Sequence, residues 1–228
     1  LVNVSVDVSS AALIEYCQKN GILYIDTVME PWLGFYIDPA LSVSQRSNYA
    51  LREMSLALRS LPIEGPRPTT ILAHGANPGL VSHFVKEALL NIAKDTGLEA
   101  DVPKTREAWA QLAKELDIKV IHIAERDTQA SPVPKKIGEF INTWSIEGFA
   151  AEGCQPAEMG WGTHEKKLPD NAREHDFGPK SAIYLEQPGY ATQVRSWTPT
   201  PRAQYAWIIT HHESISISDY LTVREGDK

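Results

Sequence analysis

Apolar residues in the first part of the chain recur in strand-like and helix-like patterns that alternate. Residues 1–6 are largely apolar, and residues 21–27 form a short β-branched and aromatic run typical of a buried parallel strand. Between these runs, Ser9 or Ser10 can cap a helix that Gly21 ends. The apolar face of this helix consists of Ala11, Leu13, Ile14 and Cys17. Strand, helix and strand in this order predict a βαβ unit.

A second crossover helix and a third strand continue the alternation. After Ser44, one helical face carries Tyr49, Ala50, Met54, Ala57 and Leu58. Residues 69–73 have the pattern of a third strand, and another helix follows them. Strands that alternate with helices predict a parallel sheet, in which ligands bind beyond the carboxyl ends of the strands. Asp7, Glu30 and residues 74–79 fall at those ends.

The pattern changes after a helix predicted at residues 105–116, for which Thr105 is a plausible cap. From about residue 118, helical periodicity nearly disappears. Strand-like runs remain at residues 118–124, 140–149, 182–186, 193–197, 205–210 and 214–223. These runs predict a mixed or antiparallel sheet with long polar loops.

These patterns place the chain in the α/β class. They predict the C-terminal half of a Rossmann-like parallel sheet, followed by a mixed or antiparallel α+β domain. We expect the two domains to occupy residues 1–104 and 105–228, with the second one incomplete. No GxGxxG sequence precedes a helix, and the sequence opens directly on an apolar strand. We therefore expect the chain to be an internal portion of a longer one.

The composition limits the kinds of partner and the cellular compartment that we expect for this protein. Lys and Arg number 22 against 29 Asp and Glu, a formal charge of −7, which argues against nucleic acid or an anionic membrane and permits cationic ligands. Cys17 and Cys154 are the two cysteines and have no CxxC spacing, so neither a disulfide framework nor a zinc site is supported. No apolar stretch approaches the roughly 20 residues that span a bilayer. We expect a cytoplasmic protein.

The sequence HGANPGL at residues 74–80 is the tightest local signal. Its glycines and proline fix a turn between a strand and a helix, where backbone can approach a ligand closely. Asn77 would present one acceptor and two donors near the helix N-terminus, which suits a carboxamide or an amine. The alternative is a turn in which the asparagine serves only local hydrogen bonding.

Acidic and aromatic residues form a second signal, because most of them stand at strand ends or in glycine-bearing loops. They are Asp7, Glu30, Trp32, Glu125, Trp144, Glu152, Glu158 and Trp161. A diamine needs carboxylates for its ammonium ends, and an indole face adds cation–π attraction of roughly 0.5 to 2 kcal/mol. Taken singly, each of these residues also fits a surface carboxylate or a core aromatic.

Histidines form a third group, in which His211 and His212 precede Glu213 at the end of a predicted strand. Successive strand residues point to opposite faces, so the two histidines are poorly placed to share a metal ion, and we predict no metal site. His211 alone could transfer protons, since its ordinary pKa of about 6.5 is close to neutral pH. The sequence contains no GxSxG motif and no cysteine next to a histidine, so these motifs give no indication of nucleophilic catalysis.

Several stretches together resemble the bacterial homospermidine synthase family, within the saccharopine dehydrogenase-like group. They are VNVSVDVSS, DTVMEPWLGFYIDP, HGANPGLVSHF, HIAERDTQ, NTWSIEGFAAEG, PAEMGWGTHE and ITHHESISISDYL. The resemblance spans essentially the whole chain. Members of the family are longer than 228 residues, so the resemblance implies an internal portion of a longer enzyme.

The resemblance implies a cytoplasmic, homodimeric transferase that uses NAD as a recycled redox cofactor. The reaction it implies joins two putrescine molecules, or putrescine with spermidine, through imine intermediates, with release of ammonia and internal return of the hydride. The product of two putrescines is homospermidine. Residues 1–104 would then be the latter part of the NAD-binding domain, and residues 105–228 would bind the substrate.

The resemblance also implies roles for individual residues. The catalytic residues would be Glu152, Trp144, Glu125, His211 and Asn77. The substrate-binding residues would be Asp7, Glu30, Asn77, Trp144 and Glu152. The cofactor-binding residues would be Ser5, Asp7, Thr27, Asn77 and Pro78.

Two other functions stay open at this point. A carboxynorspermidine synthase or saccharopine-type imine reductase would consume NAD(P)H and would need an arginine for the carboxylate of its substrate. Arg126, Arg195 and Arg202 are candidates for that role. A non-catalytic polyamine-binding module is the other alternative.

Overall fold

The computed structural model describes residues 1–98, 101–123, 128–196 and 202–224. Its first part is a parallel sheet of three short strands in the order β1-β2-β3. The strands are β1 (Val2–Asn3), β2 (Tyr24–Asp26) and β3 (Thr70–Ile71). In register, Val2 pairs with Ile25 and Tyr24 with Thr70. The predicted parallel sheet is confirmed.

Two helices connect these strands, and each begins at a serine. Helix α1 (Ser10–Lys19) is capped by Ser9, whose side chain accepts a hydrogen bond from the backbone N–H of Ala12. Helix α2 (Asn48–Ala57) is capped by Ser47 in the same way. Two 3-10 turns, η1 (Phe35–Ile37) and η2 (Leu58–Ser60), flank α2 along the chain. The core between α1 and the sheet consists of Ile14, Cys17 and Tyr24.

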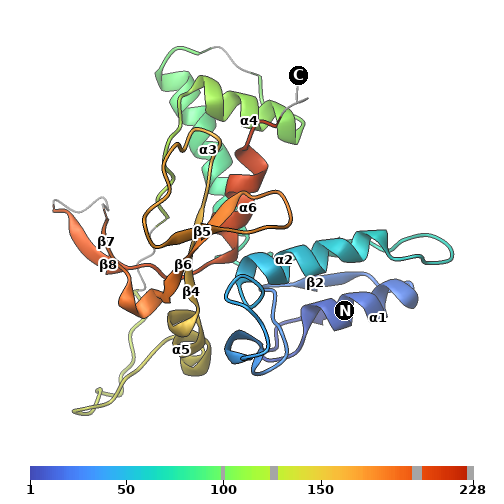
Figure 1. The fold of residues 1–228 in the computed structure, drawn as a ribbon, viewed down its shortest axis with the longest axis vertical. Coiled ribbons are helices and arrows are strands. Elements are labelled where there is room, and N and C mark those ends of the chain that lie inside the picture. Colours follow the sequence, from blue (N-terminus) through green and yellow to red (C-terminus); the bar gives the residue numbers. More distant parts are fainter. Residues whose placement is uncertain (99–100, 124–127, 197–201, 225–228) are drawn as a thin grey trace.

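Three further helices gather in a second core. They are α3 (Leu80–Asp95), α4 (Arg106–Glu115) and α6 (His212–Leu221). Thr105 caps α4 as predicted. Leu89 of α3 packs with Trp109 and Leu112 of α4, and Tyr220 of α6 packs against them. The last helix of the chain thus lies beside α3 and α4 (Figure 1).

The remaining strands are antiparallel. A sheet in the order β4-β6-β5 joins β4 (Pro156–Gly160), β6 (Ala182–Pro188) and β5 (Ala172–Glu174). A separate hairpin pairs β7 (Gln193–Ser196) with β8 (Gln204–Trp207), and the turn η3 (Gly189–Ala191) precedes it. Helix α5 (Ile146–Cys154) leads into β4. The predicted α/β chain with a parallel and an antiparallel part is confirmed.

Three of the predicted strands are wrong. Residues 118–123 form no strand, residues 140–149 run into α5, and residues 214–223 lie largely in α6. In the last segment, Ile215 and Ile217 alternate with serines, a period-two pattern that indicates a strand. Both isoleucines are instead buried from a helix, so packing of α6 against α4 and β4 outweighs the local pattern.

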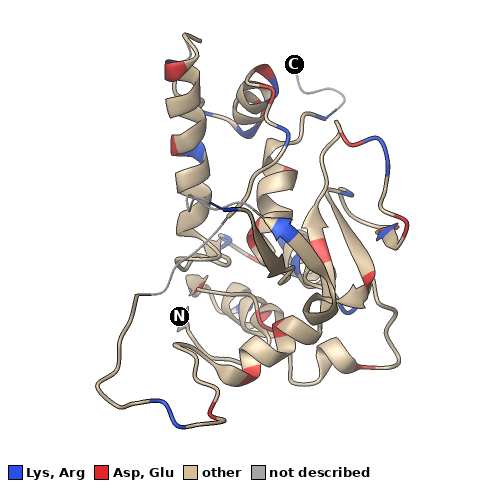
Figure 2. Ribbon diagram, turned by 90° about the vertical axis from the view of Figure 1, so that its left-hand side faces the viewer, with Lys and Arg blue, Asp and Glu red and all other residues tan. Residues whose placement is uncertain are grey.

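Charged residues of both signs are spread over the ribbon, and α3 itself carries both (Figure 2). Among the described residues, no helix combines the length and the apolar character that crossing a membrane requires.

Candidate active site

The candidate site begins at the carboxyl ends of β1 and β2, where Asp7 and Glu30 stand. Asp7 has a left-handed backbone, with φ of 59°. The backbone N–H of Glu30 donates to Ser10 Oγ at 3.0 Å, and the N–H of Ser10 donates to the Glu30 carbonyl at 2.8 Å. Burial, followed by the charges of Asp7 and Glu152, raises the pKa of Glu30 to about 7. These two carboxylates therefore lie close to Glu30.

A loop of residues 74–79 covers the end of β2. The N–H of His74 donates to the Asp26 carbonyl at 2.9 Å, and Gly79 has φ of 126°. A Cβ on Gly79 would lie 2.4 Å from the carbonyl oxygen of Gly75, and a Cβ on Gly75 would lie 3.1 Å from that of Thr27. Only glycine fits the first position. The loop thus brings Asn77 and Pro78 to the edge of the sheet at which Thr27 is exposed.

A carboxylate and histidine cluster lies where α5 ends and α6 begins. Glu152 Oε2 is 3.7 Å from His211 Nε2, and His211 Nδ1 is 3.0 Å from Glu213 Oε2. Burial raises the pKa of Glu152 to about 7, His211 opposes this shift, and Glu213 adds to it. Since Glu152 also acts on the pKa of Glu30, the structure brings together four residues from four segments: Asp7, Glu30, Glu152 and His211.

Tyr36 is a site residue that sequence reasoning missed. Its hydroxyl donates to Asn48 Oδ1 at 2.8 Å. Burial raises the pKa of this phenol well above its usual value, and the charges of Glu30, Glu158 and Glu152 add to the shift. The Tyr36 hydroxyl is thus within electrostatic reach of these three glutamates. A lone tyrosine in a loop carries no pattern, and only the density of acidic and aromatic residues at positions 26–39 could have indicated it.

The structure gives local contacts for two other predicted site residues, Trp144 and Ser5. Trp144 is 49% exposed just before α5 and packs edge to face on Phe149, with 6.2 Å between ring centroids. Glu125 lies outside the described residues. The hydroxyl of Ser5 donates to Asn3 Oδ1 at 2.5 Å.

His211 and His212 have separate partners, although they begin a helix and do not end a strand. His212 Nε2 is 3.2 Å from the Met29 carbonyl oxygen. Burial lowers the pKa of His212 to about 4, and the charge of His211 contributes to that shift. In the part of the chain that the structure describes, no group of three or more His, Cys, Asp or Glu could hold a metal ion.

The arrangement suits amine chemistry. Carboxyl groups with a pKa near neutrality can bind an ammonium group when ionised and exchange protons with it. His211, flanked by Glu152 and Glu213, is placed to carry such protons. Gly75 and Gly79 let the loop at residues 74–79 pack closely on its own backbone and on Thr27, which holds Asn77 and Pro78 at this edge of the sheet.

Comparison with known proteins identifies related families and enzymes. A family model described as the saccharopine dehydrogenase NADP binding domain matches residues 1–64. A second, the saccharopine dehydrogenase C-terminal domain, matches residues 75–227. The two matches leave residues 65–74 between them, in the segment that leads from α2 to the loop at residues 74–79.

Two curated relatives are homospermidine synthases. The protein from Blastochloris viridis is 59% identical over 225 residues, which cover 99% of this chain and 47% of the relative. The protein from Mesorhizobium japonicum is 55% identical over 226 residues, which cover 98% of this chain and 46% of the relative. The chain therefore spans about half the length of the curated relatives it matches.

A solved structure agrees with these relatives. The crystal structure of a homospermidine synthase from Legionella pneumophila in complex with NAD matches with a TM-score of 0.82 and 50% sequence identity. The match covers 100% of this chain and 47% of that one. The predicted resemblance is confirmed: the chain belongs to the saccharopine dehydrogenase-like family, in which its similarity is to homospermidine synthases.

Proposed function

We propose that this chain forms the amine-binding share of a homospermidine synthase. The enzyme would be an NAD-dependent transferase that joins two putrescines, or putrescine with spermidine, and releases ammonia. One observation carries the proposal. Glu30 and Glu152 come from segments far apart in the sequence, the pKa of each is raised to about 7, and the charge of Glu152 contributes to the shift at Glu30. Burial and like charges disfavour the ionised form of these carboxyl groups. A cationic ligand favours that form, so such a site binds a cation well.

The residues at the sheet edge fit one end of a dinucleotide. The backbone of Gly75 and Gly79 leaves no room for a Cβ, and Thr27 is exposed beside this loop. We expect Thr27, Asn77 and Pro78 to hold the nicotinamide end, with Ser5 and Asp7 contributing from the end of β1. NAD, when bound, supplies reversible oxidation of the carbon that carries the amine.

The carboxylates would hold and orient the ammonium groups. Glu152 would fix the reacting amine, while Asp7 and Glu30 would attract the second charge of the diamine. Trp144 would present its ring face to cationic intermediates. His211 lies within 3.7 Å of Glu152 and would relay protons between substrate and solvent. Glu125 would complete the polar pocket.

Several features of the whole enzyme stay predictions. We expect a cytoplasmic homodimer that acts on diamines and polyamines and not on nucleic acid or membranes. The domain division near residue 104 also stays a prediction. Of the arginines that an imine reductase could use for the carboxylate of its substrate, Arg126 lies outside the described residues, Arg195 lies on β7 and Arg202 is exposed.

The full-length protein supplied with putrescine and NAD tests the proposal. We expect homospermidine and ammonia in equal amounts, with no net change in NADH absorbance. A reductase would instead consume NAD(P)H in proportion to its product, and a binding module would form no product. Either of those two outcomes rejects the proposed function.

A further inference from the structure

Asp26 is a buried carboxylate that the proposed amine chemistry does not use. It lies at the carboxyl end of β2 and is 0% exposed, so neither substrate nor solvent reaches it. Burial raises the pKa of Asp26, and hydrogen bonds from Ala73, Tyr24 and Ser10 oppose this shift. Burying a carboxyl group is costly, and this one touches no ligand, so its role lies in the groups that it holds.

Two consecutive N–H groups of the chain that follows β3 donate to Asp26. The N–H of Ala73 donates to Asp26 Oδ1 at 2.5 Å, and the N–H of His74 donates to the Asp26 backbone carbonyl at 2.9 Å. Ala73 has a left-handed backbone, with φ of 51°, which residues other than glycine rarely adopt. Asp26 therefore holds a strained residue directly before the loop at residues 74–79.

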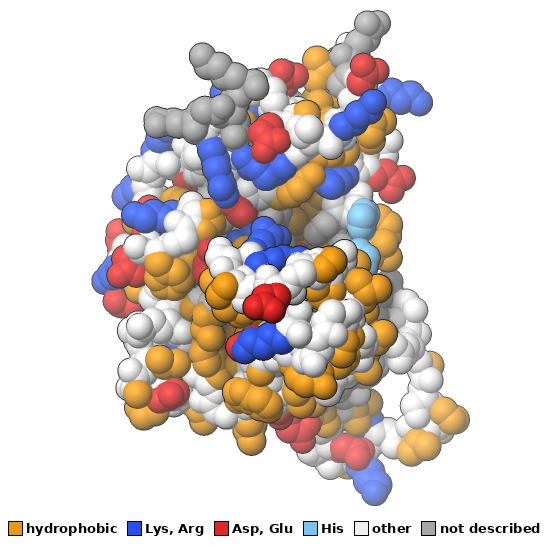
Figure 3. Space-filling model, turned by 90° about the vertical axis from the view of Figure 1, so that its right-hand side faces the viewer, with side chains coloured by type: hydrophobic (Ala, Val, Ile, Leu, Met, Phe, Trp, Pro, Cys, Tyr) orange, Lys and Arg blue, Asp and Glu red, His pale blue; other side chains and the backbone are white. Residues whose placement is uncertain are grey.

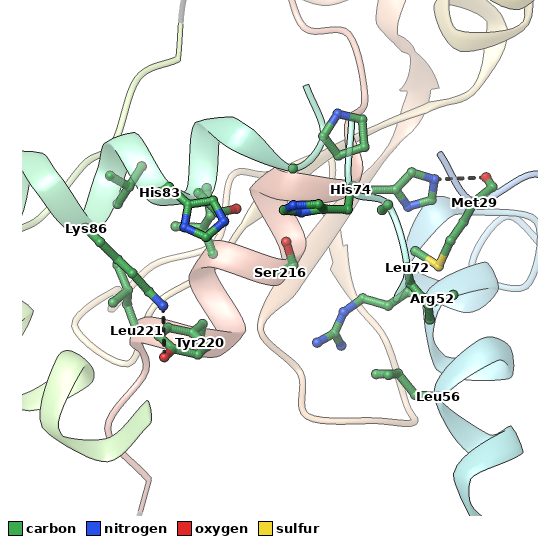
Figure 4. Close-up of a pocket in the computed structure, with 17 residues that line it drawn as sticks. Met29, Arg52, Leu56, Leu72, His74, His83, Lys86, Ser216, Tyr220 and Leu221 are labelled. Carbon is green, nitrogen blue, oxygen red and sulfur yellow. Dashed lines mark hydrogen bonds between the residues drawn. The ribbon is translucent and has the colours of Figure 1, made fainter. Parts of the chain in front are cut away.

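The other side of this loop borders a cavity of about 310 Å³ between α2, α3 and α6. The space-filling view in Figure 3 shows a hollow with histidine side chains at its rim. Figure 4 shows His74 beside the open centre of the cavity, and its ring meets that of His83 edge to face, with 5.6 Å between centroids. Because open space lies on that side, the position of the loop relative to the sheet depends on its contacts with β2.

A chain of hydrogen bonds leads from Asp26 to the end of β1. The Tyr24 hydroxyl donates to Asp26 Oδ2 at 2.9 Å and accepts from Asn3 Nδ2 at 3.2 Å. Asn3 Oδ1 accepts from the N–H of Ser5 at 3.2 Å and from the Ser5 hydroxyl at 2.5 Å. Tyr24 and Asn3 are both buried. Each donor in this chain points toward the carboxylate, so a negative charge on Asp26 strengthens every bond in it.

We infer that Asp26 is a positioning residue that ties together the two segments expected to hold NAD. Its bonds to the chain before residue 75 fix the loop that carries Asn77 and Pro78. Its bond to Tyr24 fixes the end of β1 that carries Ser5. This inference rests on the proposed function, which assigns both segments to the cofactor. One buried anchor then sets the geometry of the cofactor site without touching NAD.

Two matched tyrosine variants of the full-length protein test the inference. Tyr24→Phe removes the hydroxyl that bonds to Asp26. Tyr49→Phe is the control, because the buried Tyr49 hydroxyl likewise donates one hydrogen bond, to the Phe177 carbonyl at 2.8 Å, and accepts one, from the Lys180 N–H at 2.9 Å. We therefore expect similar falls in melting temperature. In calorimetric titration with NAD, only Tyr24→Phe should lose affinity, by about threefold.

Asp26→Asn tests the anchor itself. It keeps the size of the side chain and replaces one acceptor oxygen by an amide donor, which then faces either the Ala73 N–H or the Tyr24 hydroxyl. We expect NAD affinity to fall about tenfold. Hydrogen–deuterium exchange of the protein without NAD gives a second readout. Peptides that cover residues 72–80 should exchange faster in this variant, and peptides that cover α4 should exchange as before.

Unchanged NAD affinity in Asp26→Asn and Tyr24→Phe overturns the inference. Equal losses of affinity in Tyr24→Phe and Tyr49→Phe also overturn it, because lower stability would then explain both. Unchanged exchange of residues 72–80 in Asp26→Asn rejects the hold on the loop. If Asp26→Asn does not fold, the two tyrosine variants decide alone. Formation of homospermidine from putrescine is a separate measurement that decides the proposed function, so the two proposals can fail separately.

Discussion

Two glutamates six residues apart, one partly exposed and one fully buried, have similarly raised pKa values in different surroundings. Burial raises the pKa of both Glu152 and Glu158 to about 7. Glu152 keeps 24% of its side chain exposed, beside His211. Glu158 is sealed, and its carboxylate accepts from the backbone N–H groups of Asn48 at 2.8 Å and Tyr49 at 3.1 Å. The first region is open to a ligand, and the second holds the start of α2 against β4.

The sealed region around Glu158 contains further buried side chains. The ring of His175 stacks on Tyr49 with 3.9 Å between centroids, and Ser44 Oγ is 2.8 Å from His175 Nδ1. Burial lowers the pKa of His175 to about 4, which keeps this histidine neutral at pH 7. A perturbed pKa thus marks a candidate catalytic group only where solvent or substrate can reach it. The two glutamates differ in access and not in the size of the shift.

The largest expected effect is on turnover, in the open region. Glu152→Gln keeps the size of the side chain and removes its charge, so we expect homospermidine formation by the full-length enzyme to fall by about two to three orders of magnitude. The fold should stay intact, because the variant removes a buried charge that burial disfavours. The measurement compares turnover with the melting temperature. Glu147→Gln, at an exposed position of the same helix, is the control and should match the unmodified enzyme.

In the sealed region around Glu158, we expect substitutions to lower the stability of the fold. Glu158→Ala leaves the backbone N–H groups of Asn48 and Tyr49 buried without acceptors, at an expected cost of about 2 to 4 kcal/mol in the free energy of unfolding. Urea denaturation of the full-length protein measures this loss. Glu158→Gln keeps one acceptor oxygen and should lose less. If Glu158→Ala were as stable as the unmodified protein, the contrast between the two regions would be wrong.

A smaller effect is expected from the helix that carries Glu152. A Cβ on Gly148 would lie 2.9 Å from Cζ3 of Trp144, whereas a Cβ on Gly153 would meet nothing within 4 Å. Gly148→Ala must therefore displace the indole ring, and we expect turnover to fall by roughly tenfold, since a misplaced ring forfeits its cation–π contribution.

Gly153→Ala is the matched control for Gly148→Ala. It adds the same methyl group to the same helix without touching the indole ring. Both substitutions raise helix propensity by about 1 kcal/mol. Equal turnover in the two variants would show that the position of Trp144 does not matter to the reaction.

The smallest effect concerns pH. Putrescine stays doubly protonated below about pH 9, so its binding follows the ionisation of Glu30 and Glu152, whose pKa values are each near 7. We expect affinity to rise about tenfold between pH 6 and pH 8 in calorimetric titrations, and less steeply in Glu152→Gln. A flat profile would contradict the role of these carboxylates.

Stability should move in the opposite direction with pH. A carboxyl group whose pKa is raised on folding binds protons more tightly in the folded protein than in the unfolded chain. Stability then falls as pH rises from about 4.5 to 7. Glu152→Gln should accordingly raise the melting temperature more at pH 8 than at pH 5.

Local patterns predicted the first part of the fold well. Ser9 caps α1, and β1, β2 and β3 pair in parallel as the alternation of strands and helices indicated. Each of these elements follows from a repeat along the chain or from a capping residue. The same reasoning failed at residues 214–223, where a strand-like alternation of Ile and Ser folds as α6. The buried surfaces of β4 and α4 are long-range partners that no local window contains.

The candidate site could be predicted only in part, because local patterns locate some of its residues and long-range contacts bring the others together. The strand ends located Asp7, Glu30 and Asn77, because the carboxyl ends of parallel strands share one edge of a sheet. Glu152 and His211 were named from residue type and family resemblance, and their distance of 3.7 Å could not be derived from their positions. Tyr36 carried no local signal, since its environment is built by α2 and by distant carboxylates.

The sequence by itself determined the parallel βαβ order, the capped helices, the family and the acidic character of the loops. Periodicity, caps and residue chemistry are properties of short segments, so a single sequence displays them. Only the tertiary structure decided that a ligand can reach Glu152 and not Glu158, and that His211 and His212 begin a helix. Access and charge balance depend on contacts between residues far apart in the chain, which local sequence patterns do not specify.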